Sequence, residues 1–205
     1  MPNEALASPS TRAISKSDEP PVPAAHKLFF IPTGLDLKVS AGYILTNSGM
    51  PSGSRLNLNG ADVSLIADLA PHFGVIADSS YVRAGNAFGT THCADILSYL
   101  IGPTFYPLIY RKTRAYVSGL AGGARVTGPF SANGVGIVTG YVNDVSWVVG
   151  GGVEYQLSPS FMLRSGADYQ YTRFFNSTEV IQGRHGFRAV CSIEFSAWRH
   201  PRARY

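Results

Sequence analysis

The chain has 205 residues, a formal net charge of +4 and only 15% charged residues, together with 22 glycines, 11 tyrosines and 11 phenylalanines. This composition is typical of a β-rich protein that faces a membrane rather than of a cytosolic enzyme. The basic residues are scattered, apart from 111–114 and the tail 199–204, so no nucleic-acid partner is expected. No run of about 20 apolar residues occurs, which excludes a transmembrane helix.

Residues 1–30 are predicted to be a disordered N-terminal segment, because this stretch is rich in Pro, Ser and Ala and shows no periodicity. It contains no apolar core of a secretory signal, so we expect the signal of an exported protein to have been removed or to lie upstream of this start. A single β-domain is predicted for residues 31–195 and a C-terminal tail for 196–205. Cys93 and Cys191 are not expected to pair, and neither suggests a metal site.

Eight stretches alternate with the period of a β-strand. In chain order they are Leu35–Thr46, Leu58–Leu69, Phe73–Tyr81, Ile96–Pro107, Ala115–Val126, 145–157, 161–172 and Phe187–Phe195. The connections alternate between long and short, with short turns at 71–72, 109–113 and 158–160, and with 127–143 as the longest predicted loop. In an antiparallel arrangement, all the long loops therefore lie at one end and all the short turns at the other.

The sixth and seventh stretches show which face carries charge. Their apolar face is broad and aromatic, and their opposite face consists of glycines, small polar residues and the charged residues Glu154, Arg164 and Asp168. Glycine and ionised side chains suit a narrow lumen, while apolar side chains suit hydrocarbon outside it. The pattern predicts an all-β fold, an eight-stranded antiparallel up-and-down transmembrane β-barrel with short periplasmic turns and longer external loops. A soluble lipocalin-type barrel is the alternative, in which the apolar face is the enclosed one.

The charged residues predicted to point inward are Asp36, Lys38, Asp62, Asp68, Asp78, Arg125, Glu154, Arg164, Asp168, Arg188 and Glu194. An eight-stranded barrel has an interior just wide enough for side chains, so we interpret these residues as a salt-bridged plug rather than an ion or proton path. The predicted lumen ion-pair network is Arg125, Glu154, Arg164, Asp168, Arg188 and Glu194. This assignment places Arg125 inward on the fifth strand and Tyr116 outward.

Outward aromatic residues near the strand ends are predicted to lie at the two lipid–water interfaces. They are Tyr43, Phe73, Tyr81, Phe105, Tyr116, Trp147, Tyr155, Phe161, Tyr171, Phe187 and Phe195.

Enzymes of such a fold would hold their catalytic residues at the external rim. His92 with Asp95, and His185, are the candidates there. Their spacing indicates no nucleophile, base and orienting group within reach of one another, so no catalytic site and no cofactor are predicted.

The chain resembles the OmpA-like eight-stranded outer-membrane β-barrels over about Leu35–Phe195. The resemblance lies in the strand rhythm, in 101–103, 119–126, 150–154 and 167–174, and in a last strand that ends on Phe195. It implies insertion into the outer membrane of a Gram-negative-type bacterium, contact with outer-membrane lipid or lipopolysaccharide, and assembly by the barrel assembly machinery, for which a terminal aromatic residue serves as a signal. We expect a monomer.

The sequence thus favours a non-enzymatic integral outer-membrane protein with a structural or adhesive envelope role, which presents external loops and has no wide pore. A narrow channel for small solutes or ions is the alternative. An outer-membrane lipid-modifying or proteolytic enzyme is a third hypothesis. The ligand of the loops does not follow from the sequence.

Overall fold

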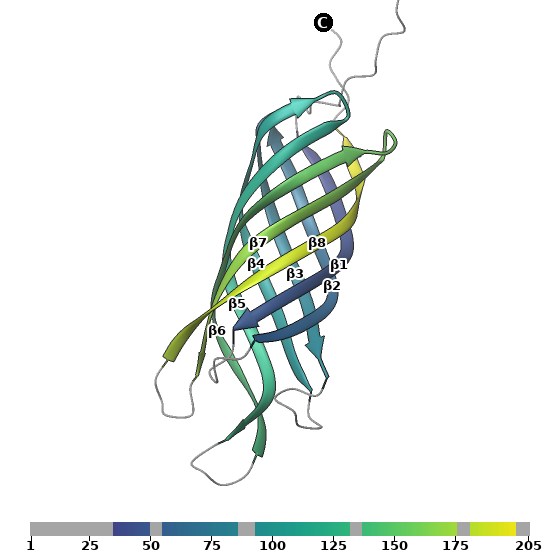
Figure 1. The fold of residues 1–205 in the computed structure, drawn as a ribbon. Helices are drawn as coiled ribbons and strands as arrows, with labels where there is room; N and C mark the ends of the chain where they lie inside the picture. Colours follow the sequence, from purple (N-terminus) through teal and green to yellow (C-terminus); the bar gives the residue numbers. More distant parts are fainter. Residues whose placement is uncertain (1–34, 50–54, 86–92, 132–136, 176–180, 200–205) are drawn as a thin grey trace, which may run out of the picture.

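The computed structural model describes residues 35–49, 55–85, 93–131, 137–175 and 181–199. They form eight strands: β1 (Asp36–Gly49), β2 (Arg55–Ala70), β3 (Phe73–Ala84), β4 (Ala94–Tyr110), β5 (Thr113–Ser131), β6 (Ile137–Gln156), β7 (Phe161–Phe175) and β8 (Ile181–Arg199). Each strand pairs antiparallel with the next and β8 pairs with β1, so the sheet closes into a barrel (Figure 1). The predicted eight-stranded barrel is confirmed.

The described residues include no helix that is long and apolar enough to cross a bilayer. The predicted N-terminal segment 1–30 and residues 200–205 lie outside the described part of the chain. Strand β8 continues past the predicted end at Phe195 to Arg199, where it pairs with Asp36.

The two ends of the barrel differ in their connections. Pro71-His72, Arg111-Lys112 and residues 157–160 join strands at one end, which we call the turn end. Arg111 has a φ of 51°, the left-handed backbone conformation that a tight two-residue hairpin turn requires. The segments 50–54, 86–92, 132–136 and 176–180 join strands at the opposite, loop end.

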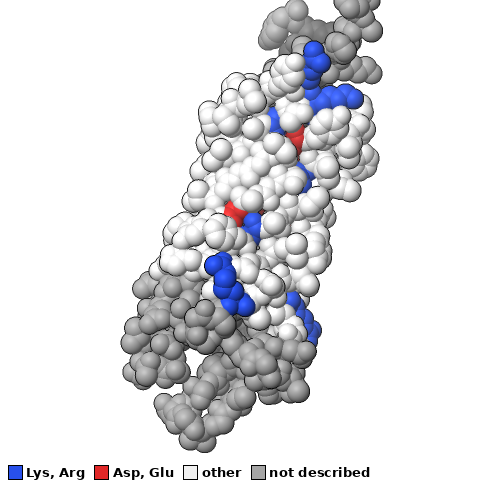
Figure 2. All heavy atoms as spheres, in the orientation of Figure 1, with Lys and Arg blue, Asp and Glu red and all other residues white. Residues whose placement is uncertain are grey.

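Outward and inward side chains alternate along the strands, with the polar set inside. On β2, the outward residues Val63 and Leu65 are 50% and 59% exposed, whereas the inward residue Asp62 is 2% exposed. On β6, Glu154 is fully buried and Val149 is 51% exposed. Most of the visible outer face is accordingly neither acidic nor basic (Figure 2). This arrangement rules out a fold that encloses the apolar face, as a lipocalin-type barrel would.

The lumen is filled with side chains at successive levels. Charged side chains gather toward the turn end, and an apolar cluster lies toward the loop end, where Ile44 and Leu58 are 0% and 1% exposed. The middle of the barrel holds a second apolar cluster, composed of Ile66, Ile76, Leu100, Leu120 and Val148.

One strand has the opposite orientation from the predicted one. On β5, Tyr116 and Leu120 are buried in the lumen, while Val117 is 50% exposed and Arg125 points outward. The prediction that Tyr116 lies outside and Arg125 inside was wrong.

A bulge in β4 is the physical reason for this orientation. The turn pairs Tyr110 with Thr113 and Leu108 with Ala115, but the register shifts before the next pair, Phe105 with Val117. Without that shift, inward Tyr106 would stand opposite Val117. One extra residue in β4 exchanges the inward and outward positions of the residues that follow it. The bulge contains Pro107, which cannot donate a ladder hydrogen bond.

The predicted loop 127–143 was also wrong in extent. β5 continues to Ser131 and β6 begins at Ile137, and the two strands pair along this whole ribbon. Gly128, Pro129 and Gly140 are poor strand formers, which hid the alternation in the sequence. The β5–β6 ribbon extends beyond the neighbouring strands at the loop end (Figure 1).

Candidate functional site

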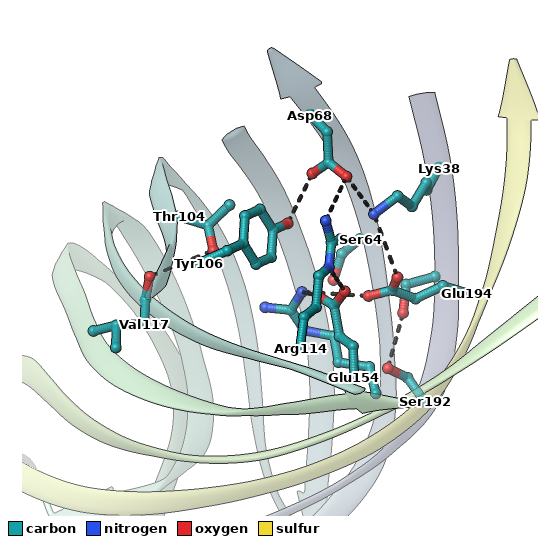
Figure 3. Close-up of polar contacts among 12 residues, drawn as sticks. Lys38, Ser64, Asp68, Thr104, Tyr106, Arg114, Val117, Glu154, Ser192 and Glu194 are labelled. Carbon is teal, nitrogen blue, oxygen red and sulfur yellow. Dashed lines mark hydrogen bonds and ion pairs between the residues drawn. The ribbon is translucent and has the colours of Figure 1, made fainter. Parts of the chain in front are cut away.

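The largest polar feature of the described lumen is a network of six charged side chains near the turn end, here called the turn-end network. Its members are Lys38, Asp68, Arg114, Glu154, Arg164 and Glu194, contributed by β1, β2, β5, β6, β7 and β8. They meet there because each of them lies within a few residues of the end of its strand that is at the turn end of the barrel. Figure 3 shows five of these side chains converging inside the barrel: Lys38, Asp68, Arg114, Glu154 and Glu194.

The contacts of this network are short and shared. Asp68 Oδ2 lies 2.5 Å from Lys38 Nζ and 2.9 Å from an Arg114 guanidinium nitrogen. Arg114 also donates to Glu154. Arg164 bridges Glu154 at 2.7 Å and Glu194 at 3.3 Å. Three cations face three carboxylates, so the formal charges cancel. A buried charge is tolerated when it is paired in this way.

Two tyrosine rings complete the network. The Arg114 guanidinium lies 3.7 Å from the ring centre of Tyr106, and that of Arg164 lies 3.6 Å from the ring centre of Tyr116. The Tyr106 hydroxyl donates to Asp68 at 2.8 Å. Stacking of a guanidinium on a ring adds to ion pairing most strongly where water is excluded. The rings therefore fix the two arginines in place.

A second group of charges, here called the acid-rich cluster, lies nearer the middle of the barrel. Arg188 on β8 faces Asp78 at 3.3 Å and both Asp62 and Asp168 at 3.8 Å. The Ser64 hydroxyl lies 3.3 Å from carboxylate oxygens of Asp62 and Asp78. Among the side chains that the structure describes, one cation thus faces three carboxylates, which leaves two formal negative charges without a cation.

The predicted ion-pair residues divide between these two groups. Glu154, Arg164 and Glu194 belong to the turn-end network, while Asp168 and Arg188 belong to the acid-rich cluster. Arg125 belongs to neither group, because it lies on the outer face with its guanidinium 4.3 Å from the ring centre of Tyr141.

Arg114 is the lumen arginine that the sequence reasoning missed. Arg114 immediately follows the predicted turn 109–113. It lies two residues before Tyr116 and therefore on the same face of β5, which was predicted to be the outer face. The inward glycines of β6 and β7 could have indicated that a large side chain of β5 points into the lumen. A Cβ on Gly166 would lie 2.1 Å from the Tyr116 hydroxyl, so glycine at that position makes room for a large ring.

The predicted interface aromatics are outward with the exception of Tyr116. At the turn end, the rings of Phe161 and Phe195 pack at 5.4 Å. Toward the loop end, Trp147 stacks on Tyr171 at 5.4 Å. Tyr43, Phe73, Tyr81, Phe105, Tyr155 and Phe187 are also exposed. Their position at a lipid–water interface stays a prediction.

The candidate catalytic residues are not brought together in the described part of the chain. Asp95 on β4 pairs with Arg83 at 3.4 Å, and His185 on β8 contacts Tyr169. His92 lies outside the described residues. Within the described ranges, no group of three His, Cys, Asp or Glu side chains is placed to hold a metal ion, and both Cys93 and Cys191 are free.

Comparison with known proteins finds similarity in structure alone. No family model and no curated protein sequence matches the chain. The crystal structure of Neisserial surface protein A superposes with a TM-score of 0.64 at 13% identity, covering 80% of this chain and 99% of that one. Ail, the attachment invasion locus protein of Yersinia pestis, gives a TM-score of 0.55 at 17% identity, covering 79% of this chain and 98% of that one.

The likeness extends over almost the whole of both solved proteins and includes the closed, all-antiparallel strand order described above. The chain therefore has the eight-stranded β-barrel fold of the outer-membrane proteins.

Proposed function

We propose that this protein is a non-enzymatic integral outer-membrane protein, a closed barrel that anchors external segments in a structural or adhesive role. The observation that carries the proposal is the inverted distribution of side chains, with apolar residues such as Ile101 and Leu65 about 60% exposed and Glu154 and Glu194 fully buried. In water, so large an apolar surface would drive association, whereas in a bilayer it meets hydrocarbon.

The filled lumen supports a closed barrel over a wide pore. A solute that crossed from end to end would have to displace the apolar cluster around Ile44 and Leu58 and then the turn-end network. Dense packing and paired charges both oppose such displacement.

The adhesive part of the proposal is supported by the loop end. There the β5–β6 ribbon extends beyond the barrel, which would expose polypeptide outside the membrane. One similar solved structure is named an attachment invasion locus protein, and the proposal extends that kind of role to this chain.

The test combines folding and conductance. The full chain, refolded in lipid vesicles, is run on a gel with and without boiling and is then examined in planar bilayers. We expect faster migration of the unboiled sample and no reproducible conductance steps. Migration at the same position with and without boiling, together with solubility in the absence of detergent, would contradict the membrane barrel.

A narrow ion channel is the second candidate, which the acid-rich cluster favours. The two excess negative charges in mid-lumen would attract cations and repel anions, if ions pass. Conductance steps with cation selectivity that falls in Asp78→Asn would replace the closed-barrel proposal with this one.

A further inference from the structure

Strand β6 is paired on one side only at the loop end. Its pairing with β7 begins at Ser146 opposite Thr172, although β7 continues to Phe175 and there pairs with β8. Continuing the β6–β7 register would set Arg173 against Val145, but the ladder contains no such pair. In the described ranges, no ladder pair joins residues 137–145 to a strand on the side facing β7, whereas β5 pairs with all of them on the other side.

The register shows which backbone groups face the open side. Gln156 N–H donates to the C=O of Lys112, the turn residue just before β5, at 2.8 Å, and the β5–β6 register has no shift from Thr113–Tyr155 to Ser131–Ile137. Backbone groups alternate sides along a strand, so the even-numbered residues of β6 bond to β5. The odd-numbered residues 137, 139, 141, 143 and 145 therefore direct N–H and C=O groups to the free edge.

One hydrogen bond agrees with this assignment. Val145 N–H donates to the Asp144 carboxylate at 2.6 Å. This donor is therefore satisfied by a side chain at the position where the β6–β7 ladder stops. The next donors along the edge, at residues 143, 141 and 139, have no ladder partner on this side among the described strands.

We propose that this edge of β6 binds an extended polypeptide segment, which adds to the sheet as a further strand. The inference rests on the proposed function and names the kind of partner that the loop end takes. A row of alternating donors and acceptors at strand spacing is complementary to another extended backbone, and such addition is an established mode of peptide recognition.

The partner is a separate polypeptide rather than a second copy of the chain. Two copies in one membrane share the same direction, so a twofold axis along the membrane normal would bring their β6 edges together in parallel. Parallel pairing is the less stable kind, which disfavours a second copy as the partner.

The outward side chains indicate the sequence that fits. Tyr141 and Val145 are 62% and 57% exposed, and Arg125 lies against the Tyr141 ring. Cross-strand pairs of aromatic and branched side chains stabilise a sheet, as do opposite charges. An extended segment with branched or aromatic residues at alternate positions and one acidic residue near Arg125 matches this edge.

The test uses the full chain folded in lipid nanodiscs and a fluorescent peptide of alternating Thr and Val with one Glu. Its matched controls carry the same side chains but are N-methylated at every second amide, in either phase. Fluorescence polarisation measures binding. We expect binding of the unmodified peptide and at least tenfold weaker binding of one methylated form. Equal binding of all forms, or of none, would overturn the proposal.

The matched protein variants are Asn143→Pro and Asn143→Ala. The Asn143 N–H points to the free edge, so proline there removes an edge donor and spares the β5 ladder. We expect Asn143→Pro to weaken peptide binding about tenfold relative to Asn143→Ala, while both keep the faster gel migration of a closed barrel. Equal binding by the two folded variants would contradict the inference.

Hydrogen exchange keeps the inference testable if Asn143→Pro does not fold. In the unmodified protein, we expect the amides of residues 139, 141 and 143 to exchange fast and to become protected when the peptide binds. Unchanged exchange under saturating peptide would overturn edge pairing. Conductance of the same sample separately tests the closed barrel. A failure of edge pairing can therefore be distinguished from a failure of the proposed function.

Discussion

The turn-end network and the acid-rich cluster are buried in the same barrel, yet they differ in charge balance. In the first, each carboxylate has cations within 4 Å, and two tyrosine rings cover the arginines. In the second, Arg188 is the one cation within 4 Å of Asp62, Asp78 and Asp168 among the side chains that the structure describes. The turn-end network is therefore held by several shared ion pairs, whereas the acid-rich cluster depends on Arg188. Four substitutions test this difference.

Arg188→Met should have the largest effect. It leaves Asp62, Asp78 and Asp168 facing one another with no cation among the described side chains. Removing one partner of a buried ion pair costs about 3–5 kcal/mol, and we expect the upper end because three carboxylates lose their partner at once. Urea unfolding of the protein in lipid vesicles measures the change. A loss no greater than that for Arg114→Met would remove the distinction between the clusters.

Arg114→Met should lower the free energy of unfolding by about 3 kcal/mol, because Asp68 retains Lys38 and Glu154 retains Arg164. The matched control is Arg125→Met on the same strand, which removes an outward guanidinium beside Tyr141. For that surface change we expect about 0.5 kcal/mol or less. A larger loss for Arg125→Met than for Arg114→Met would show that β5 faces the other way, and equal losses would contradict the predicted difference.

Tyr106→Phe removes a single hydroxyl from the turn-end network. That hydroxyl donates to Asp68 at 2.8 Å, and a hydrogen bond to a charged group contributes about 1.5–3 kcal/mol. Asp68 keeps Lys38 and Arg114, so we expect a loss of about 1.5 kcal/mol in the same unfolding assay. An unchanged stability would mean that the two cations alone satisfy Asp68.

Asp62→Asn should give the smallest effect, and one of opposite sign. It removes one of the two excess negative charges and keeps an oxygen that can accept from Ser64. We expect the free energy of unfolding to rise by up to about 1 kcal/mol, since a neutral group replaces a poorly paired buried charge. Glu154→Gln in the turn-end network is the contrast and should destabilise. A loss in both would indicate that the acid-rich cluster needs every carboxylate.

The strand count, the antiparallel order and the inward orientation of most charges could be read from the sequence, because a period of two is a local property of a strand. Glu154, Arg164 and Glu194 follow their own alternation, and the structure finds them inside and in contact. The glycines on the inward face of β6 and β7 likewise marked a narrow interior.

The face of β5 and the grouping of charges required the tertiary structure. Both faces of β5 carry small residues, so alternation alone did not orient the strand, and the bulge between Phe105 and Leu108 decided it. Which inward charges meet depends on the stagger of strands around the closed barrel, which brings Lys38 on β1 to Asp68 on β2 and Arg188 on β8 to Asp78 on β3. Alternation sets the face on which a side chain lies, whereas closure and register set its neighbours.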